Sequence, residues 1–359
     1  MRWRRALGIV AAQVGALLCV ALAAEVGVRC WREKGIRAGF ASLVDGRGTQ
    51  IDPGTRGAFA RDDELGYRLQ PALEGVNRLG FRGPELPAKK PPGRFRILVV
   101  GDSIAWDADG FVTGLESRFR TEFRGDVEVF NASVPGYTTF QERVFLGRLL
   151  APVAPDVVVL EYCLNDNHRF LHRLTEDGGW LLTPEARATL LPDGDGVAAR
   201  VARWSYLAFE IRKRLLALER RSGSVHPWES EPDFGPAWKQ ETWPAERAEI
   251  LAIQAATRAA DARLLVLAVP YEPQLEPSLL ARERDLALAP QAHLASICRD
   301  AAIPFLDLAP AFESARTAHP SEPLFRDRVH LTAAGHAVAA AALRDRLCAE
   351  RLLPADCAR

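Results

Sequence analysis

Apolar runs and polar turns alternate along residues 93–359 in the rhythm of an α/β domain. Five short apolar runs have the length and composition of buried strands: Phe95–Val100, Val127–Phe130, Val157–Leu160, Leu264–Val269 and Ile303–Leu306. Helical periodicity is clearest over residues 139–150, 244–260, 285–300 and 331–349. Strands that alternate with helices predict a parallel sheet covered by helices on both faces.

Polar segments directly follow three of the predicted strands. They are Gly101–Ser103, Asn131–Gly136 and Cys163–Asp166. Functional loops of parallel sheets gather at the carboxyl ends of the strands. We therefore expect these three segments to lie along one edge of the sheet.

Residues 167–243 interrupt the rhythm and are predicted to be an insertion. Its best-formed stretch places apolar residues on one helical face, namely Val197, Val201, Trp204, Leu207, Ala208, Ile211, Leu215 and Leu218. We expect this helix to dock on the domain through that face. A lid or a helix on a membrane surface is the alternative.

The N-terminal segment has the pattern of a membrane-spanning helix. Met1–Arg5 is basic, and Ala6–Ala24 follows without a charged residue. As a helix this run would span roughly 28 Å, close to the ~30 Å hydrocarbon core of a bilayer. The arginines predict a cytoplasmic N-terminus and an extracytoplasmic remainder, periplasmic or at the cell surface. We expect an uncleaved anchor over residues 1–24, and a signal peptide cleaved after Ala23 is the alternative.

Residues 25–92 show weak periodicity and many glycines, prolines and arginines. They predict a stalk that becomes an N-terminal extension of the main domain, which covers residues 93–359. Gly66–Leu69 and Asn77–Gly83 mix turn formers with single aromatic residues, as expected of a loop fastened to a surface.

Composition narrows the class of protein. Lysine plus arginine and aspartate plus glutamate number 46 each, so there is no net charge to attract nucleic acid, and no nucleic-acid partner is expected. The six cysteines do not form a disulfide framework in a chain of this size, although Cys348 and Cys357 could pair in an oxidising compartment. The Cys and His spacings do not resemble a zinc site, so no metal is expected.

Ser103 has the position of a nucleophile. It ends Gly101-Asp102-Ser103, directly after the first predicted strand. A serine at such a turn exposes its hydroxyl at the sheet edge, and the following helix N-terminus favours developing negative charge. Gly-Asp-Ser is also common in ordinary turns, so this segment alone is a weak signal.

A base for that serine stands before the last predicted helix. In Asp327-Arg-Val-His330 the carboxylate can reach Nδ1 of the ring, which leaves Nε2 free to take a serine proton. Taken alone, the segment also fits a helix start capped by Asp327. His336 is expected to pack or to orient other groups rather than to react.

Two further residues can donate hydrogen bonds to an oxyanion. Gly136 offers a bare N–H in a turn, and the amide of Asn165 follows the third strand. Either residue could also be ordinary turn chemistry.

In combination these segments resemble the SGNH/GDSL hydrolase family, over about residues 94–349. The four blocks that carry the resemblance occur in the family's order: Gly101-Asp-Ser103, Gly136, Asn165-Asp166 and Asp327-x-x-His330. The resemblance implies a three-layer α/β/α, flavodoxin-like fold with a central parallel sheet. It also implies a serine hydrolase that needs no cofactor.

The same resemblance assigns roles to the residues. Ser103 would be the nucleophile, His330 the base and later the acid, and Asp327 the group that orients His330. The N–H groups of Ser103 and Gly136 and the side chain of Asn165 would form the oxyanion hole.

Two departures from the family are visible. The third block usually opens with glycine, where this chain has Cys163, and Gly-Asp-Ser continues as Ile104-Ala-Trp106 rather than with the leucine-rich sequence of the lipase branch. Residues 66–103 resemble a membrane-anchored bacterial branch instead.

The expected function is an extracytoplasmic esterase that removes O-acyl groups, O-acetyl among them, from a cell-envelope glycan or lipid. Its partners would be the acyl-ester substrate and the membrane. An O-acyltransferase with the same triad is an alternative, and so is a non-catalytic envelope-binding protein. A metal-dependent hydrolase using Asp102, Asn165 and His330 is conceivable, but those residues are a poor ligand set.

Overall fold

The computed structural model describes residues 2–32, 35–37, 39–40, 57–70, 73–174, 180–191 and 196–354. The chain divides into two compact units. The first, here the α1 unit, comprises Met1–Arg56 and His172–Pro232, and the second, the sheet unit, comprises Gly57–Leu171 and Asp233–Arg359. All the predicted site residues lie in the sheet unit.

The sheet unit is built on a five-stranded parallel sheet of order β4-β3-β5-β8-β9. Its strands are β3 (Phe95–Val100), β4 (Val127–Asn131), β5 (Val157–Tyr162), β8 (Arg263–Ala268) and β9 (Phe305–Asp307). All five predicted strands are present. The chain leaves β3 for the edge strand β4 and then crosses back to β5, so the order reverses beside β3, where open α/β sheets bind ligands.

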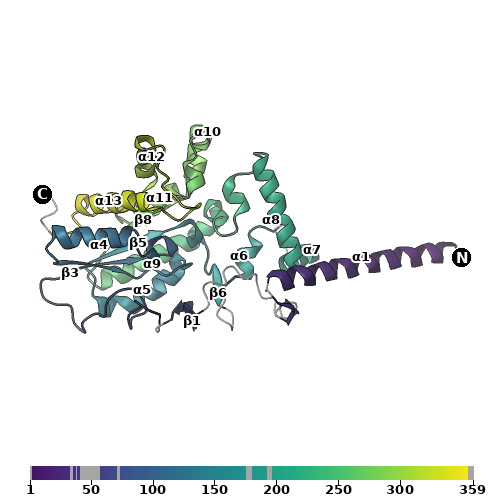
Figure 1. Ribbon diagram of the computed structural model, residues 1–359, viewed down its shortest axis with the longest axis horizontal. Coiled ribbons are helices and arrows are strands. Elements are labelled where there is room, and N and C mark those ends of the chain that lie inside the picture. Colours follow the sequence, from purple (N-terminus) through teal and green to yellow (C-terminus); the bar gives the residue numbers. More distant parts are fainter. Residues whose placement is uncertain are drawn as a thin grey trace. The chain divides into compact units, whose positions relative to one another are not determined.

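Helices cover both faces of this sheet, as predicted (Figure 1). The helices of the sheet unit are α3 (Ser103–Trp106), α4 (Phe111–Glu122), α5 (Thr139–Val153), α9 (Trp243–Ala259), α10 (Pro277–Ala287), α11 (Ala289–Asp300), α12 (Ala309–Ala318) and α13 (Ala333–Ala349). Helices α4 and α13 lie over one face, and α5 lies over the other. The apolar side chains of α4 and α13 bury against Ile97 and Val99 of β3, which forms the core on that face.

The N-terminal extension is fastened to the loop that contains Gly136. Strands β1 (Phe59–Asp62) and β2 (Gly66–Leu69) form an antiparallel hairpin. The buried Tyr67 donates its hydroxyl to the carbonyl of Pro135 at 3.1 Å, and the Tyr137 hydroxyl donates to the carbonyl of Tyr67 at 2.8 Å. These two hydrogen bonds fasten the residues on either side of Gly136 to β2.

The α1 unit starts with one long helix, α1 (Arg2–Arg32). Its segment Gly8–Trp31 is long and apolar enough to cross a membrane. The helix therefore continues past Ala24, where the uncharged run ends. The rest of the unit contains the hairpin β6 (His172–Leu174) and β7 (Trp180–Leu182), and helices α6 (Pro184–Ala188), α7 (Val197–Trp204) and α8 (Tyr206–Arg221).

A buried ion pair at the end of α1 joins it to α8. The Glu25 carboxylate accepts hydrogen bonds from the Tyr206 N–H at 2.8 Å and from the Ser205 hydroxyl at 2.7 Å, so it caps the start of α8. The Arg29 guanidinium binds Glu25 at 2.6 Å and the Trp204 carbonyl at 2.7 Å. Glu25 is 4% exposed and Arg29 is fully buried, so each charge depends on the other.

The prediction for the helix of residues 197–218 was wrong in two respects. The helix is broken at Ser205, whose side chain accepts from the N–H of Ala208 and starts a new helix. The side chains that α8 buries are Tyr206, Phe209 and Leu216. The apolar positions expected to dock are largely exposed: Val197, Val201, Trp204, Ile211, Leu215 and Leu218. Helix α7 ends at Trp204 and α8 begins at Tyr206, so the segment is two helices rather than one.

Candidate active site

Ser103 is the first residue of α3, directly after β3. Asp102 caps this short helix, and its Oδ1 accepts from the N–H of Ile104 at 2.8 Å. A side chain at Gly101 would overlap the carboxylate of Glu161 on the neighbouring strand. Local packing therefore explains the glycine at position 101, and helix capping explains the aspartate at position 102. The turn presents Ser103 at the carboxyl end of the sheet.

The end of α3 is held by two side chains from other segments. Asn131 donates its amide to the carbonyl of Ala105 at 2.6 Å. Arg82, in the N-terminal extension, donates to the carbonyl of Trp106 at 3.1 Å, and its guanidinium lies 3.7 Å from the centre of the Trp106 ring. These contacts fix the helix that carries Ser103.

Asp327 and His330 lie in a tight hairpin between α12 and α13. The Arg326 N–H donates to the carbonyl of His330 at 2.9 Å, which closes the hairpin. Asp327 Oδ1 accepts from the backbone N–H groups of Val329 and His330, and Oδ2 lies 2.8 Å from Nδ1 of the His330 ring. Partial burial opposes ionisation, but these hydrogen bonds hold the pKa of Asp327 below its usual value.

Asp327 is not the cap of the last helix, which was the other interpretation of this segment. Helix α13 is capped by Thr332, whose hydroxyl accepts from the N–H of Gly335 at 3.2 Å. The Asp327 carboxylate is directed to the His330 ring instead.

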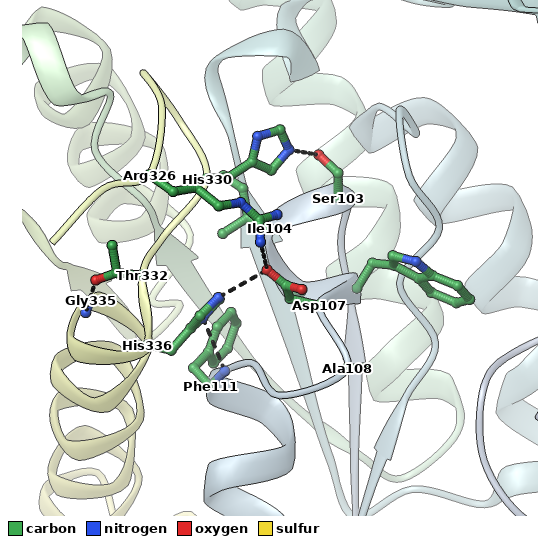
Figure 2. Close-up of polar contacts among 12 residues, drawn as sticks. Ser103, Ile104, Asp107, Ala108, Phe111, Arg326, His330, Thr332, Gly335 and His336 are labelled. Atoms are coloured by element: carbon green, nitrogen blue, oxygen red, sulfur yellow. Dashed lines mark hydrogen bonds and ion pairs between the residues drawn. The ribbon is translucent and has the colours of Figure 1, made fainter. Parts of the chain in front are cut away.

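Ser103 and His330 meet across 227 positions of sequence. The hydroxyl of Ser103 lies 3.0 Å from Nε2 of His330 (Figure 2). With Nδ1 donating to Asp327, the neutral ring has its lone pair on Nε2, where it can accept the serine proton. The His330 side chain is 28% exposed, so this pair is within reach of a bound ester.

Gly136 and Asn165, the two remaining predicted residues, lie on connected loops. Gly136 has φ +72°, which a residue with a side chain would adopt only with strain, and the Val134 N–H ties its loop to the carbonyl of Gly101. Asn165 lies in the short helix Leu164–Asn167 and donates to the carbonyl of Tyr137 at 3.0 Å. The Asn165 amide thus holds the loop that presents the Gly136 N–H.

Asn165 also affects the electrostatics of the turn. Its side chain opposes the rise in the pKa of Asp102 that burial causes. Asn165 is only 2% exposed, so it is a buried part of the framework around Ser103.

Buried carboxyl groups beneath Ser103 were missed by the sequence analysis. Asp102, Glu142, Glu161, Asp166 and Glu246 are all nearly inaccessible to solvent. Burial raises the pKa of each of them, well above the usual range for Glu142, Glu161 and Asp166 and to about 8 for Glu246. An available signal was the single glutamate inside the apolar run of β5.

A polar cluster around Asp107 lies beside the Ser103–His330 pair, and Figure 2 shows both. Asp107 Oδ2 lies 2.9 Å from the guanidinium of Arg326 and 3.3 Å from Nε2 of His336. The other ring nitrogen of His336 accepts from the N–H of Phe111 at 3.2 Å, and the two rings stack. His336 thus contacts its neighbours as a packing and orienting residue would. No sequence motif indicated that Asp107 and Arg326 lie beside His336.

Among the residues that the structure describes, no group of three or more His, Cys, Asp or Glu side chains could hold a metal ion. The suggested pairing of Cys348 with Cys357 involves a residue outside the described ranges.

Comparison with solved structures gives three examples of similar chains. LAE5, an alpha/beta hydrolase enzyme from the metagenome of Lake Arreo in Spain, is 17% identical, with 73% of this chain and 97% of that chain covered and a TM-score of 0.44. The acetyl xylan esterase AlAXEase is 15% identical, with 70% and 98% covered and a TM-score of 0.43. TesA is 17% identical, with 72% and 99% covered and a TM-score of 0.42. No curated protein matches the chain.

The sequence itself matches the family described as GDSL-like Lipase/Acylhydrolase over residues 99–338. This match includes the Gly-Asp-Ser turn, the Gly136 loop, Asn165 and the hairpin of Asp327 and His330. The chain belongs to the GDSL-like lipase/acylhydrolase family and is a hydrolase of ester bonds.

Proposed function

We propose that this chain is a membrane-anchored, extracytoplasmic serine esterase that removes O-acyl groups, O-acetyl among them, from a cell-envelope glycan or lipid. One observation carries the proposal: Ser103, His330 and Asp327 form a continuous chain of contacts at 3.0 and 2.8 Å. Those separations are within the range for proton transfer from a nucleophile to its base.

The reaction has two steps. Ser103 Oγ attacks the acyl carbonyl carbon while its proton passes to Nε2 of His330, and the resulting imidazolium is stabilised by Asp327. His330 then gives this proton to the departing alkoxide, which leaves an acyl-enzyme. In the second step His330 takes a proton from water while the water oxygen attacks the acyl carbon. The bond to Ser103 Oγ then breaks, His330 returns the proton to Oγ, and the free acid leaves.

The negative charge on the carbonyl oxygen needs donors during both steps. The N–H of Ser103 at the start of α3 and the N–H of Gly136 would supply two of them. Asn165 would supply a third with its side-chain amide, which now donates to the carbonyl of Tyr137.

The position in the envelope is supported by α1. Its apolar segment follows basic residues at the N-terminus, a distribution that favours a cytoplasmic N-terminus and an extracytoplasmic catalytic domain. Ester-bearing glycans and lipids are the acylated substrates that such an anchored enzyme would meet.

The test is covalent labelling of the full-length, detergent-solubilised protein with a fluorophosphonate probe. We expect wild-type protein to be labelled, and Ser103→Ala to lose both labelling and several orders of magnitude of esterase turnover. Ser117→Ala, at an exposed position on α4, is the matched control and should behave as wild type. Equal labelling of Ser103→Ala, or none in folded wild-type protein, would overturn the proposal and favour a binding protein.

Product analysis with added glycan acceptors then separates hydrolysis from acyl transfer.

A further inference from the structure

The two reacting groups of the proposed site come from separate parts of the sheet unit. Ser103 lies on the four-residue helix α3, whereas His330 lies on a hairpin that packs before α13. The distance of 3.0 Å between Oγ and Nε2 therefore depends on how α3 is held against that hairpin. A misplacement of about 1 Å can cost about a hundredfold in rate.

Asp107 lies at the junction of these parts. It is the C-terminal cap residue of α3, four positions after Ser103. Its Oδ2 contacts Arg326, the residue immediately before Asp327, and His336, in the first turns of α13 (Figure 2). One carboxylate oxygen thus joins the helix of the nucleophile to both the hairpin and the helix that follows it.

The geometry also determines which nitrogen of His336 carries the proton. Nδ1 accepts from the N–H of Phe111, so it must be unprotonated, and Nε2 carries the hydrogen that points to Asp107. The ring is 6% exposed and stacks on Phe111. Burial lowers the pKa of His336, which keeps it in this neutral form. His336, on α13, is therefore a fixed donor to Asp107, held in place by the first residue of α4.

We propose that Asp107 is a positioning residue, which, through Arg326 and His336, holds α3 against the hairpin and keeps Ser103 Oγ within reach of His330 Nε2. The proposal rests on the serine mechanism given above and adds residues outside its triad and oxyanion hole. Asp107 does not contact the reacting atoms and acts through the placement of Ser103.

The experiment measures kcat, KM and the rate of fluorophosphonate inactivation for Asp107→Asn and Arg326→Met. Asparagine keeps the shape of Asp107 but has no negative charge. Its single neutral oxygen replaces the carboxylate that accepts from Arg326 and His336. We expect kcat and the inactivation rate to fall together by roughly tenfold to a hundredfold, with KM nearly unchanged. Arg326 is about half exposed, so its replacement should leave the protein folded.

A pair of substitutions at His336 separates positioning from packing. His336→Gln keeps a donor for Asp107, whereas His336→Phe keeps the stacked ring but has no donor. We expect the glutamine variant to recover most of the kcat that the phenylalanine variant loses. If phenylalanine is the better replacement, the residue acts through packing and the proposal fails.

Arg344→Met provides the matched control. Arg344 pairs with Glu122 at 3.2 Å, so it links α13 to α4 as His336 does, but away from Ser103. We expect this variant to lower thermal stability without lowering kcat. If wild-type protein reacts with the probe and Asp107→Asn and Arg326→Met react equally fast, the positioning proposal is overturned while the proposed function stands. If wild-type protein does not react at all, both fall together.

Discussion

At the scale of single residues, Asn165 is a buried part of the framework around Ser103. Its amide holds the carbonyl of Tyr137 and so fixes the loop of Gly136. The proposed mechanism also requires this amide as an oxyanion donor. A donor already oriented by its neighbours needs little reorganisation when charge develops.

We expect Asn165→Ala to lower kcat by about 10²–10³-fold, the usual cost of removing one oxyanion donor. The matched control is Asn167→Ala in the same short helix, whose side chain contacts Tyr162 and Thr242 instead. Steady-state kinetics on an acetyl ester, with thermal melts of both variants, make the comparison. An equal and small loss in the two variants would leave Asn165 as a loop-fixing residue only.

At the scale of helices and strands, the contact of α5 with α9 contains a buried acid. Glu246 on α9 accepts a hydrogen bond from the hydroxyl of Thr139 on α5 at 2.7 Å and is 3% exposed. Burial raises its pKa to about 8 from an ordinary value of 4.5. Between these values the unfolded chain has lost a proton that the folded chain keeps. The free energy of unfolding therefore falls as pH rises, by up to about 1.4 kcal/mol per pH unit.

Glu246→Gln should remove this dependence, because glutamine keeps the oxygen that accepts from Thr139 and has no proton to lose. We expect the variant to be more stable than wild type at pH 8, with an advantage that shrinks towards pH 5. Urea unfolding at several pH values measures it. Glu249→Gln is on the same helix as Glu246 and removes an ion pair with Arg143 of α5, and it should give no such gain. A pH-independent difference would show that Glu246 is ionised in the folded protein.

The strands were predictable because they are covered on both faces and therefore read as unbroken apolar runs. Helix α4 was not predicted: its buried residues Phe111, Val112, Leu115 and Phe119 are separated by polar positions in a short segment. The break at Ser205 was missed because it depends on a cap supplied by Glu25 and by the Ser205 side chain itself. Local periodicity carries no information about such distant partners.

At the scale of the whole chain, local patterns also failed to predict contacts between distant parts of the site. Ser103, Gly136, Asn165 and the Asp327–His330 pair could be recognised because each follows a predicted strand or precedes a predicted helix. The contact of Asp107 with Arg326 and His336 joins segments more than 200 positions apart, and no motif marks it. The buried acids were missed because carboxylates are usually exposed, although Glu161 stands within the apolar run of β5.

The cap that Glu25 provides gives a prediction for the α1 unit. Replacing Glu25 by Ala removes two acceptors from the start of α8 and takes the carboxylate away from the buried Arg29 guanidinium, a combination that typically costs several kcal/mol. We expect α7 and α8 to open more often, and trypsin to cut at the basic residues of α8 at least about tenfold faster. Mass spectrometry of timed digests in detergent measures this.

Glu116→Ala is the control for that experiment, since Glu116 forms an exposed ion pair with Arg120 within one helix of the sheet unit. Cleavage in α8 at the wild-type rate in Glu25→Ala would mean that the buried pair does not hold the α1 unit together.

The cap by Glu25 also sets an order of events during synthesis. Glu25 and Ser205 are 180 positions apart, so at about 5–20 residues per second the carboxylate exists roughly 10 to 40 s before the helix start that it serves. Until then Arg29, one turn away, is the nearest counterion for Glu25. Residues 57–171, which include the first three strands of the parallel sheet, are made during this interval. Synthesis of the α1 unit thus begins before these strands and ends after them. In a chain arrested before Ser205, the α1 helix would be complete, but the Glu25 carboxylate would not yet cap α8.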